Sequence, residues 1–257
     1  MAPKRIVSLT TTSYRIAFIE PVIQSILGQT LPADQVRVYL SEEPHLFDEG
    51  VARNQIPPFL KGIADTGRVQ LLFTENIGPY RKILPCLAEH QTDDCIIVTA
   101  DDDTVYPDYW LQLLCEAHRQ HPNTVIAFRG AEMVFSGGRL LPYQDWNRHE
   151  RLRNEYLMLN FATGKDGILY SPRFFDEKVF DRTFLKIAPS GDDIWLKFAS
   201  LVRGVGVLIL DPESHLQEIT IPGGISLWDT INRSSNDQTV RSVMDHFGFT
   251  DQKLSAL

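Results

Sequence analysis

The feature that most constrains the fold is one short stretch, Cys95–Pro107, which reads CIIVTADDDTVYP. Residues 96–99 form a continuous apolar and β-branched run, short enough for a buried strand. Because the run does not alternate with polar residues, it predicts a central parallel strand that is covered on both faces. Such strands are typical of α/β folds, in which helices lie on both sides of one sheet.

Three aspartates follow that strand directly: Asp101, Asp102 and Asp103. Adjacent carboxylates in a partly buried place repel one another unless a positive group lies among them. The carboxyl ends of strands are also where α/β sheets bind ligands. Mg²⁺ and Mn²⁺ favour carboxylate oxygens together with substrate phosphates, so we expect one of these ions here. The alternative is a solvated turn with an Asp capping the next helix, although one cap needs only one aspartate.

The rest of the chain alternates between predicted strands and predicted helices. We expect further strands at 5–9, 35–40, 69–73, 124–128, 167–170, 184–187 and 205–210, and helices at 18–27, 80–89, 108–120, 192–201 and 239–247. This order predicts a doubly wound, mainly parallel α/β sheet in a single domain covering 1–257. Residues 130–161 lose the regular pattern but keep aromatic residues, which indicates an insertion or lid.

Composition and charge restrict the partners of the chain. A formal net charge of −8 argues against non-specific binding to nucleic acid or an anionic membrane, but not against an anionic substrate that is neutralised locally. Three cysteines without metal-site spacing fit a reducing compartment. No apolar run is long enough for a signal peptide or a transmembrane segment. We therefore expect a cytoplasmic protein, with peripheral recruitment to a membrane left open.

Polar residues at the ends of the other predicted strands are candidates for a nucleotide-diphosphate pocket. They are Thr10, Tyr14 and Arg15 after the first strand, Ser41 and Glu42 after the second, and Asn76, Gly78, Arg81 and Lys82 after the third. A glycine beside a helix start lets a phosphate approach the backbone, and Lys82 would compensate the charge of a diphosphate. Arg81 and Lys82 fit equally well on the exposed face of a helix.

A second pair of acids, Asp192 and Asp193, opens a predicted helix in the segment PSGDDIW. The helix dipole favours negative charge at that position, so plain capping explains the pair as well as any function does. The functional alternative is a general base, which would take a proton from an attacking hydroxyl beside the metal and diphosphate.

Taken together, these segments resemble a known family. TADDDTVYP after a buried strand resembles the DxD motif of GT-A glycosyltransferases, and GDD before a helix resembles their later acidic motif, usually Glu-Asp. IVSLTTTSYR, NIGPYRK and LWDTINRSSND are similar to segments of bacterial GT-A enzymes of the family-2 type. A DxD string alone is unspecific, and the order of the segments carries the resemblance, which is weakest between residues 130 and 161.

The resemblance implies a GT-A (Rossmann-like) fold with a nucleotide-binding half (1–105), an acceptor half (106–225) and a C-terminal tail (226–257). It also implies an activity: metal-dependent, inverting transfer of a sugar from a nucleotide-sugar donor, UDP-linked, to a glycan or lipid-linked acceptor in bacterial surface polysaccharide synthesis. No nucleic acid is among the implied partners.

The resemblance also implies residue roles. Asp101 would contact the ribose or uracil side with Asp102 beside it. Asp103, with Asp101 as a further ligand, would bind Mn²⁺ or Mg²⁺ on the diphosphate. The loop at 10–15, the end of the second strand and Lys82 would contact the nucleotide.

In the acceptor half, Asp193 would be the base of an inverting displacement. Asp192 stands where the family usually has Glu, which leaves open which acid faces the acceptor. His215 is a candidate metal ligand, although a lone histidine is more often structural. Asp166, in the turn that spans residues 164–167, would line the donor sugar.

Two other functions remain open from the sequence. One is a nucleotidyltransferase that makes the nucleotide-sugar, and the other is a non-catalytic nucleotide-sugar-binding module. Against the first, TTTSYR follows the first strand where a glycine-rich, basic phosphate loop would be needed. A binding module would keep ligand affinity in an Asp193→Asn variant and would have no turnover to lose. Residues 232–237 fit either a lid over the diphosphate or a solvated loop.

Overall fold

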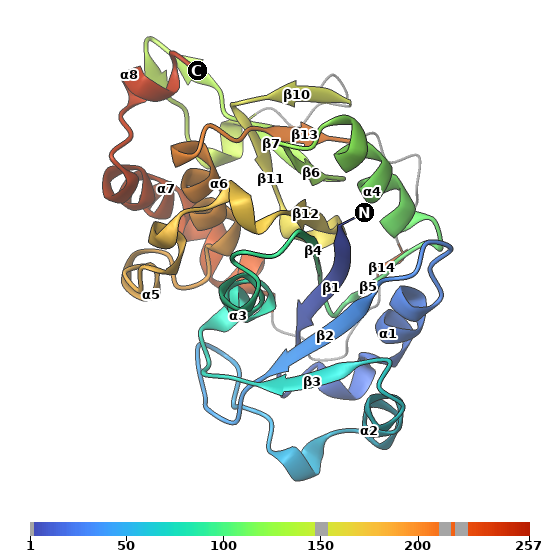
Figure 1. The fold of residues 1–257 in the computed structure, drawn as a ribbon. Helices are drawn as coiled ribbons and strands as arrows, with labels where there is room; N and C mark the ends of the chain where they lie inside the picture. Colours follow the sequence, from blue (N-terminus) through green and yellow to red (C-terminus); the bar gives the residue numbers. More distant parts are fainter. Residues whose placement is uncertain (1–2, 147–153, 211–216, 219–225) are drawn as a thin grey trace.

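The computed structural model describes residues 3–146, 154–210, 217–218 and 226–257. They form a mixed α/β domain around one large central sheet (Figure 1). Its eight strands in these ranges are β1 (Lys4–Thr10), β2 (Gln35–Leu40), β3 (Gln70–Phe73), β4 (Cys95–Ala100), β6 (Val125–Ala127), β10 (Glu155–Leu157), β12 (Ile168–Tyr170) and β13 (Val207–Ile209).

The strands are ordered β10-β13-β6-β12-β4-β1-β2-β3. β1 pairs in parallel with both β2 and β4, β2 with β3, and β13 with β6. β12 lies antiparallel between β4 and β6, and β10 is antiparallel to β13. The predicted mainly parallel sheet is therefore confirmed, with two antiparallel strands in its second half.

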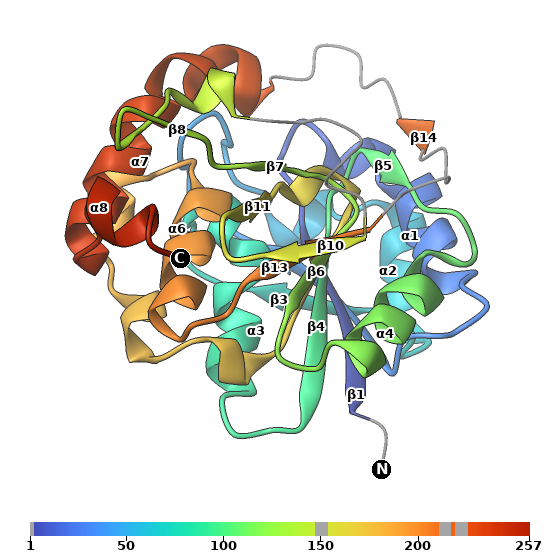
Figure 2. The ribbon, with the colours of Figure 1, turned by 90° about the horizontal axis from the view of Figure 1, so that it is seen from above.

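Helices cover both faces of this sheet, and Figure 2 shows the two groups on opposite sides of the strands. On one face lie α1 (Glu20–Leu27), α2 (Pro58–Asp65) and α4 (Trp110–Gln120); on the other lie α3 (Leu84–Glu89), α5 (Phe184–Ile187), α6 (Asp192–Val202), α7 (Arg233–Phe247) and α8 (Asp251–Leu254). Ile96 and Val98 of β4 belong to the first core, whereas Ile97 belongs to the second. Because β4 is buried on both faces, its apolar run is continuous.

The described parts of the segment 130–161, for which the pattern predicts an insertion or lid, form short strands. Its described elements include β7 (Gly130–Glu132), β8 (Phe135–Ser136), β9 (Arg139–Leu140) and β11 (Asn160–Ala162). β7 pairs with β11, and β8 with β9. The aromatic residues Tyr143, Trp146 and Phe161 join the core beneath α6 and α7.

The predicted strand at 184–187 is wrong, because these residues form helix α5. A run of four residues is too short for periodicity to separate the two structures. Packing decides here, since the Phe184 ring stacks on Tyr80 with 4.2 Å between ring centroids. The strand β5 (Thr104–Val105), paired with β14 (Gln217–Glu218), is a further element that the pattern does not predict.

The segment 232–237, for which a lid or a solvated loop was expected, is helical. A π-helix, Trp228–Asn232, runs directly into α7. Within the described ranges, no helix combines the length and apolar character needed to cross a membrane.

Candidate active site

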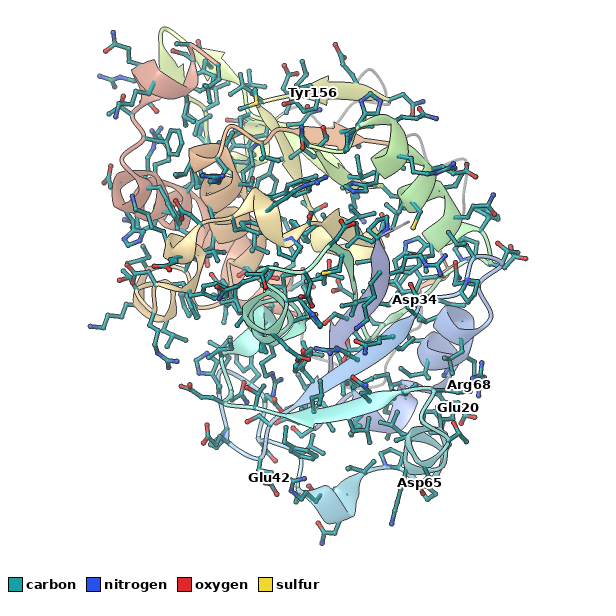
Figure 3. The ribbon with its side chains drawn as sticks, viewed as in Figure 1. Glu20, Asp34, Glu42, Asp65, Arg68 and Tyr156 are labelled. Carbon is teal, nitrogen blue, oxygen red and sulfur yellow. The ribbon has the colours of Figure 1, made fainter. Side chains whose placement is uncertain are left out.

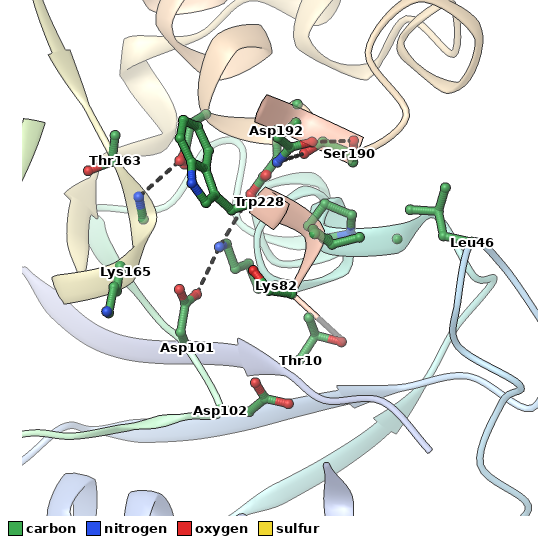
Figure 4. A pocket seen from close by; sticks show the side chains of 18 of the residues that line it. Thr10, Leu46, Lys82, Asp101, Asp102, Thr163, Lys165, Ser190, Asp192 and Trp228 are labelled. Carbon is green, nitrogen blue, oxygen red and sulfur yellow. Dashed lines mark hydrogen bonds and ion pairs between the residues drawn. The ribbon is translucent and has the colours of Figure 1, made fainter. Parts of the chain in front are cut away.

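A pocket of about 570 Å³ opens at the carboxyl ends of β1 and β4, where the predicted site lies (Figure 4). Ligands of α/β sheets bind at this edge. Seven aspartates and five lysines or arginines are among its lining residues. The lining therefore carries more negative than positive side chains before any ligand enters.

Each aspartate of the triplet contacts a cation of the protein. Arg15 Nη1 donates to Asp102 Oδ1 and to Asp103 Oδ2, both at 2.8 Å. Lys82 Nζ donates to Asp101 Oδ1 at 2.9 Å. Burial opposes the charge of Arg15, but the adjacent carboxylates outweigh burial and raise its pKa. The positive groups expected beside three aspartates are thus partly supplied by the chain itself.

Lys82 joins the two acidic motifs. Its Nζ lies 2.9 Å from Asp101 Oδ1 and 3.3 Å from Asp192 Oδ2, and the side chain is buried. Burial alone would lower the pKa of Lys82, but the carboxylates of Asp101, Asp192 and Asp193 hold it well above its usual value. The alternative of an exposed helix face is wrong for Lys82 and also for Arg81, which is 1% exposed.

Asp193 is the acid suited to take up a proton. Its Oδ2 accepts a hydrogen bond from the Gly164 backbone N–H at 3.0 Å, while its Oδ1 is buried and has no hydrogen-bond partner among the described residues. Burial, and next the charge of Asp192, raise the pKa of Asp193 to about 7 against the opposing effect of Lys82. A carboxylate that titrates near neutral pH is poised for general-base work.

Gly164 is fixed by close approach to this acid. A Cβ at this position would lie 3.0 Å from Lys82 Nζ and 3.2 Å from Asp193 Oδ1. Glycine therefore leaves room for Lys82 Nζ, which pairs with Asp101 and Asp192, while the Gly164 N–H binds Asp193.

The pocket lining also includes a buried ion pair that the sequence does not reveal. Asp48 Oδ2 accepts from Arg81 Nη2 at 2.8 Å and from Asn76 Nδ2 at 3.1 Å, and Asp48 Oδ1 accepts from the Ser13 backbone N–H at 2.9 Å. Arg81 Nε and Nη1 and His45 Nε2 are buried without hydrogen-bond partners in the described part of the chain. Asp48 lies in an irregular loop, where no periodicity marks it.

The remaining predicted residues divide into two groups. Thr10 and Tyr14 line the pocket, whereas Ser41, Glu42, Asn76 and Asp166 do not. Ser41 Oγ accepts from the Glu43 backbone N–H, Glu42 lies at the edge of the molecule (Figure 3), and Asn76 instead holds Asp48. In the predicted turn, Gly164 and Lys165 line the pocket in place of Asp166. His215 lies outside the described residues.

Asp101 and Asp103 are the carboxylates of the pocket that could hold a divalent cation together with a substrate. No group of three or more His, Cys, Asp or Glu arranged around a metal position is found in the ranges that the structure describes. Mg²⁺, however, needs only one or two carboxylates when substrate phosphates and water complete its shell. The side chains of Asp101 and Asp103 are 26% and 23% exposed. Burial and the charge of Asp101 raise the pKa of Asp103, as expected where negative charge is in excess.

Asp48→Ala is expected to lower the free energy of unfolding by about 3–5 kcal/mol, because Arg81 would keep a buried charge without its partner. Glu75→Ala is the matched control, because it breaks an exposed ion pair with Arg182. The Glu75 side chain is 51% exposed and the Arg182 side chain 58%. That loss should be at most about 1 kcal/mol. Urea unfolding followed by circular dichroism measures both, and equal losses would contradict a structural role for the buried pair.

Among the comparisons with known proteins, the one with solved structures supports the fold. No protein-family model matches the chain, and no curated protein matches it. Among 233 matching chains of solved structures is S. aureus TarS 1–349, with a TM-score of 0.57 and 15% sequence identity. The match covers 94% of this chain and 63% of the TarS chain. At this identity the similarity shows the fold alone, and the predicted α/β class with a mainly parallel sheet is confirmed.

Proposed function

We propose that the protein is a metal-dependent inverting glycosyltransferase. It moves a sugar from a UDP-sugar to a hydroxyl of a glycan or lipid-linked acceptor in bacterial surface polysaccharide synthesis. One observation carries the proposal: Lys82 bridges Asp101 and Asp192, which brings the acidic segment 101–103 close to Asp193, a carboxylate whose pKa is raised to about 7. The similarity to S. aureus TarS, at 15% sequence identity, supports the proposal at the level of fold alone.

Each side chain then has a part in the transfer. Asp101 and Asp103 would hold Mn²⁺ or Mg²⁺, and the ion would supply neutralisation of charge on the leaving diphosphate. Lys82 Nζ stabilises the same charge from the floor of the pocket. The Asp193 carboxylate takes the acceptor proton while the acceptor oxygen bonds to the anomeric carbon. The bond from that carbon to the diphosphate oxygen breaks in the same step, and its electron pair leaves with the diphosphate, so no covalent sugar–enzyme intermediate forms.

Unpartnered donors in the pocket lining support a pyrimidine base on the donor. Arg81 Nε and Nη1 are buried N–H donors without partners among the described residues. The carbonyl oxygens of uracil are acceptors that would satisfy such donors. A buried donor that makes no hydrogen bond is unfavourable. Burial lowers the pKa of His45, so its ring is neutral at pH 7 and adds hydrogen-bonding capacity without charge.

A screen of nucleotides for thermal stabilisation tests this function. UDP-sugars with Mn²⁺, at about 100 times Kd, are expected to raise Tm by roughly 5 °C or more. The same compounds with EDTA should have a much smaller effect. Stabilisation that is equal with and without the metal would contradict the proposal. A nucleoside triphosphate that outperforms every nucleotide-sugar would favour the nucleotidyltransferase.

A further inference from the structure

Trp228 is unlike the other tryptophans of the chain. Trp110, Trp146 and Trp195 are at most 3% exposed, whereas Trp228 is 42% exposed and lines the pocket (Figure 4). A large aromatic side chain left open to water in a pocket offers an apolar surface that a ligand can cover.

Aromatic packing supports the Trp228 ring. Tyr143 lies 6.0 Å from it between ring centroids. Tyr143 in turn packs on Trp146 at 4.8 Å and on Phe161 at 5.6 Å, and these three side chains are buried. The indole is therefore backed by a close-packed core.

The helix start that carries the proposed base also holds Trp228 in place. Trp228 opens the π-helix that ends at Asn232, and π-helical turns are frequent at functional sites. Ser190 Oγ donates to Asn232 Oδ1 at 2.6 Å, and Asn232 Nδ2 donates to the Ser190 carbonyl at 3.4 Å. Ser190 lies three residues before Asp193, just ahead of α6, so Trp228 and Asp193 belong to one side of the pocket.

We infer that Trp228 is the surface on which a pyranose ring of the acceptor stacks, an inference that rests on the proposed glycosyltransferase function. A pyranose has an apolar C–H face and a hydroxyl rim. The indole would bury that face while the rim hydroxyls meet the carboxylates beside it. The nucleotide base is the less fitting occupant, because the buried, unpartnered nitrogens of Arg81 and His45 in the pocket lining offer a base the hydrogen bonds that an indole face lacks.

Acrylamide quenching of tryptophan fluorescence tests the contact directly, since Trp228 is the exposed tryptophan. The protein is measured alone, with UDP and Mn²⁺, and with UDP, Mn²⁺ and a millimolar methyl pyranoside of the gluco, galacto or N-acetylglucosamine series. At least one pyranoside is expected to lower the quenching below that seen with UDP and Mn²⁺. Full protection by UDP alone assigns the ring to the base and overturns the inference, as does the absence of protection by any pyranoside.

Variants separate the acceptor contact from the donor site. Trp228→Ala is expected to raise KM for the protecting pyranoside about tenfold, as when roughly 60 Å² of apolar contact is lost, with Trp228→Phe in between. The Kd for UDP should change far less. Tyr109→Ala, which removes an aromatic ring of 38% exposure outside the pocket, should match wild type. If wild type fails to bind UDP, the proposed function fails; if UDP binds but acceptor KM is unchanged in Trp228→Ala, only this inference fails.

Discussion

Asp193→Asn is expected to lower kcat for sugar transfer by about 10²- to 10⁴-fold, because the asparagine side chain cannot take the acceptor proton. The amide oxygen can still accept the Gly164 N–H, so the local geometry is kept. UDP affinity, measured by calorimetry with Mn²⁺, should stay within about threefold of wild type, because general-base loss affects the transition state rather than donor binding. A variant that keeps wild-type kcat would remove Asp193 from the mechanism.

The pH dependence identifies which acid is the base. Deprotonated Asp193 is the active form and its pKa is raised to about 7, so kcat/KM should rise as pH increases through that value. The charge of Asp192 contributes to this raised pKa. Asp192→Asn should therefore move the rising limb to lower pH, whereas Asp193→Asn should abolish it. The opposite pattern in the two variants would assign the base to Asp192.

Loss of activity in Asp193→Asn is not expected to reflect unfolding. The folded protein raises the pKa of this carboxyl, so its ionised form is disfavoured in the folded state relative to the unfolded chain. Above pH 7, a neutral asparagine removes that unfavourable charge. The Tm of the variant at pH 8 should thus equal or exceed that of wild type.

The centre of the fold could be predicted because its residues obey a simple pattern. The apolar run of β4 is buried on both faces, and the acids after it lie at the ligand-binding edge of the sheet. Strand direction has no such signature. The three residues of β12 are buried like those of a parallel strand, yet β12 runs antiparallel to both neighbours. Tertiary contacts set that direction, and a run of three residues does not record them.

The candidate site could be predicted only where its residues sit next to a regular element. Asp101 and Lys82 follow strands β4 and β3, and Asp193 opens a helix, so the pattern points to each of them. Asp48 and Trp228 come from an irregular loop and a π-helical turn, where neither a period of two nor one of 3.6 applies. Ser41 shows the converse failure: it ends a strand as expected, but its hydroxyl is used in a local turn.

Asp103→Ala should weaken the binding of UDP in the presence of Mn²⁺ by about 100-fold, as expected for truncation of one partner in a close charge interaction. Without metal, the same substitution is not expected to weaken UDP binding. Arg15, which binds both Asp102 and Asp103, would lose one carboxylate and become more available to a diphosphate. Metal-free UDP affinity should therefore stay equal or increase, so that the variant loses metal dependence rather than binding as a whole.

A charge-matched control separates a metal ligand from a general effect of negative charge. Asp229→Ala removes the same charge from an exposed residue that lines the same pocket. Because exposed charges are screened over about 10 Å at 0.1 M salt, UDP affinity with Mn²⁺ should change by less than about threefold. Calorimetry of UDP with and without Mn²⁺ on both variants measures the difference. If Asp103→Ala keeps the full wild-type response to Mn²⁺, the cation binds elsewhere. The aspartates at 101–103 would then serve only to position Arg15 and Lys82.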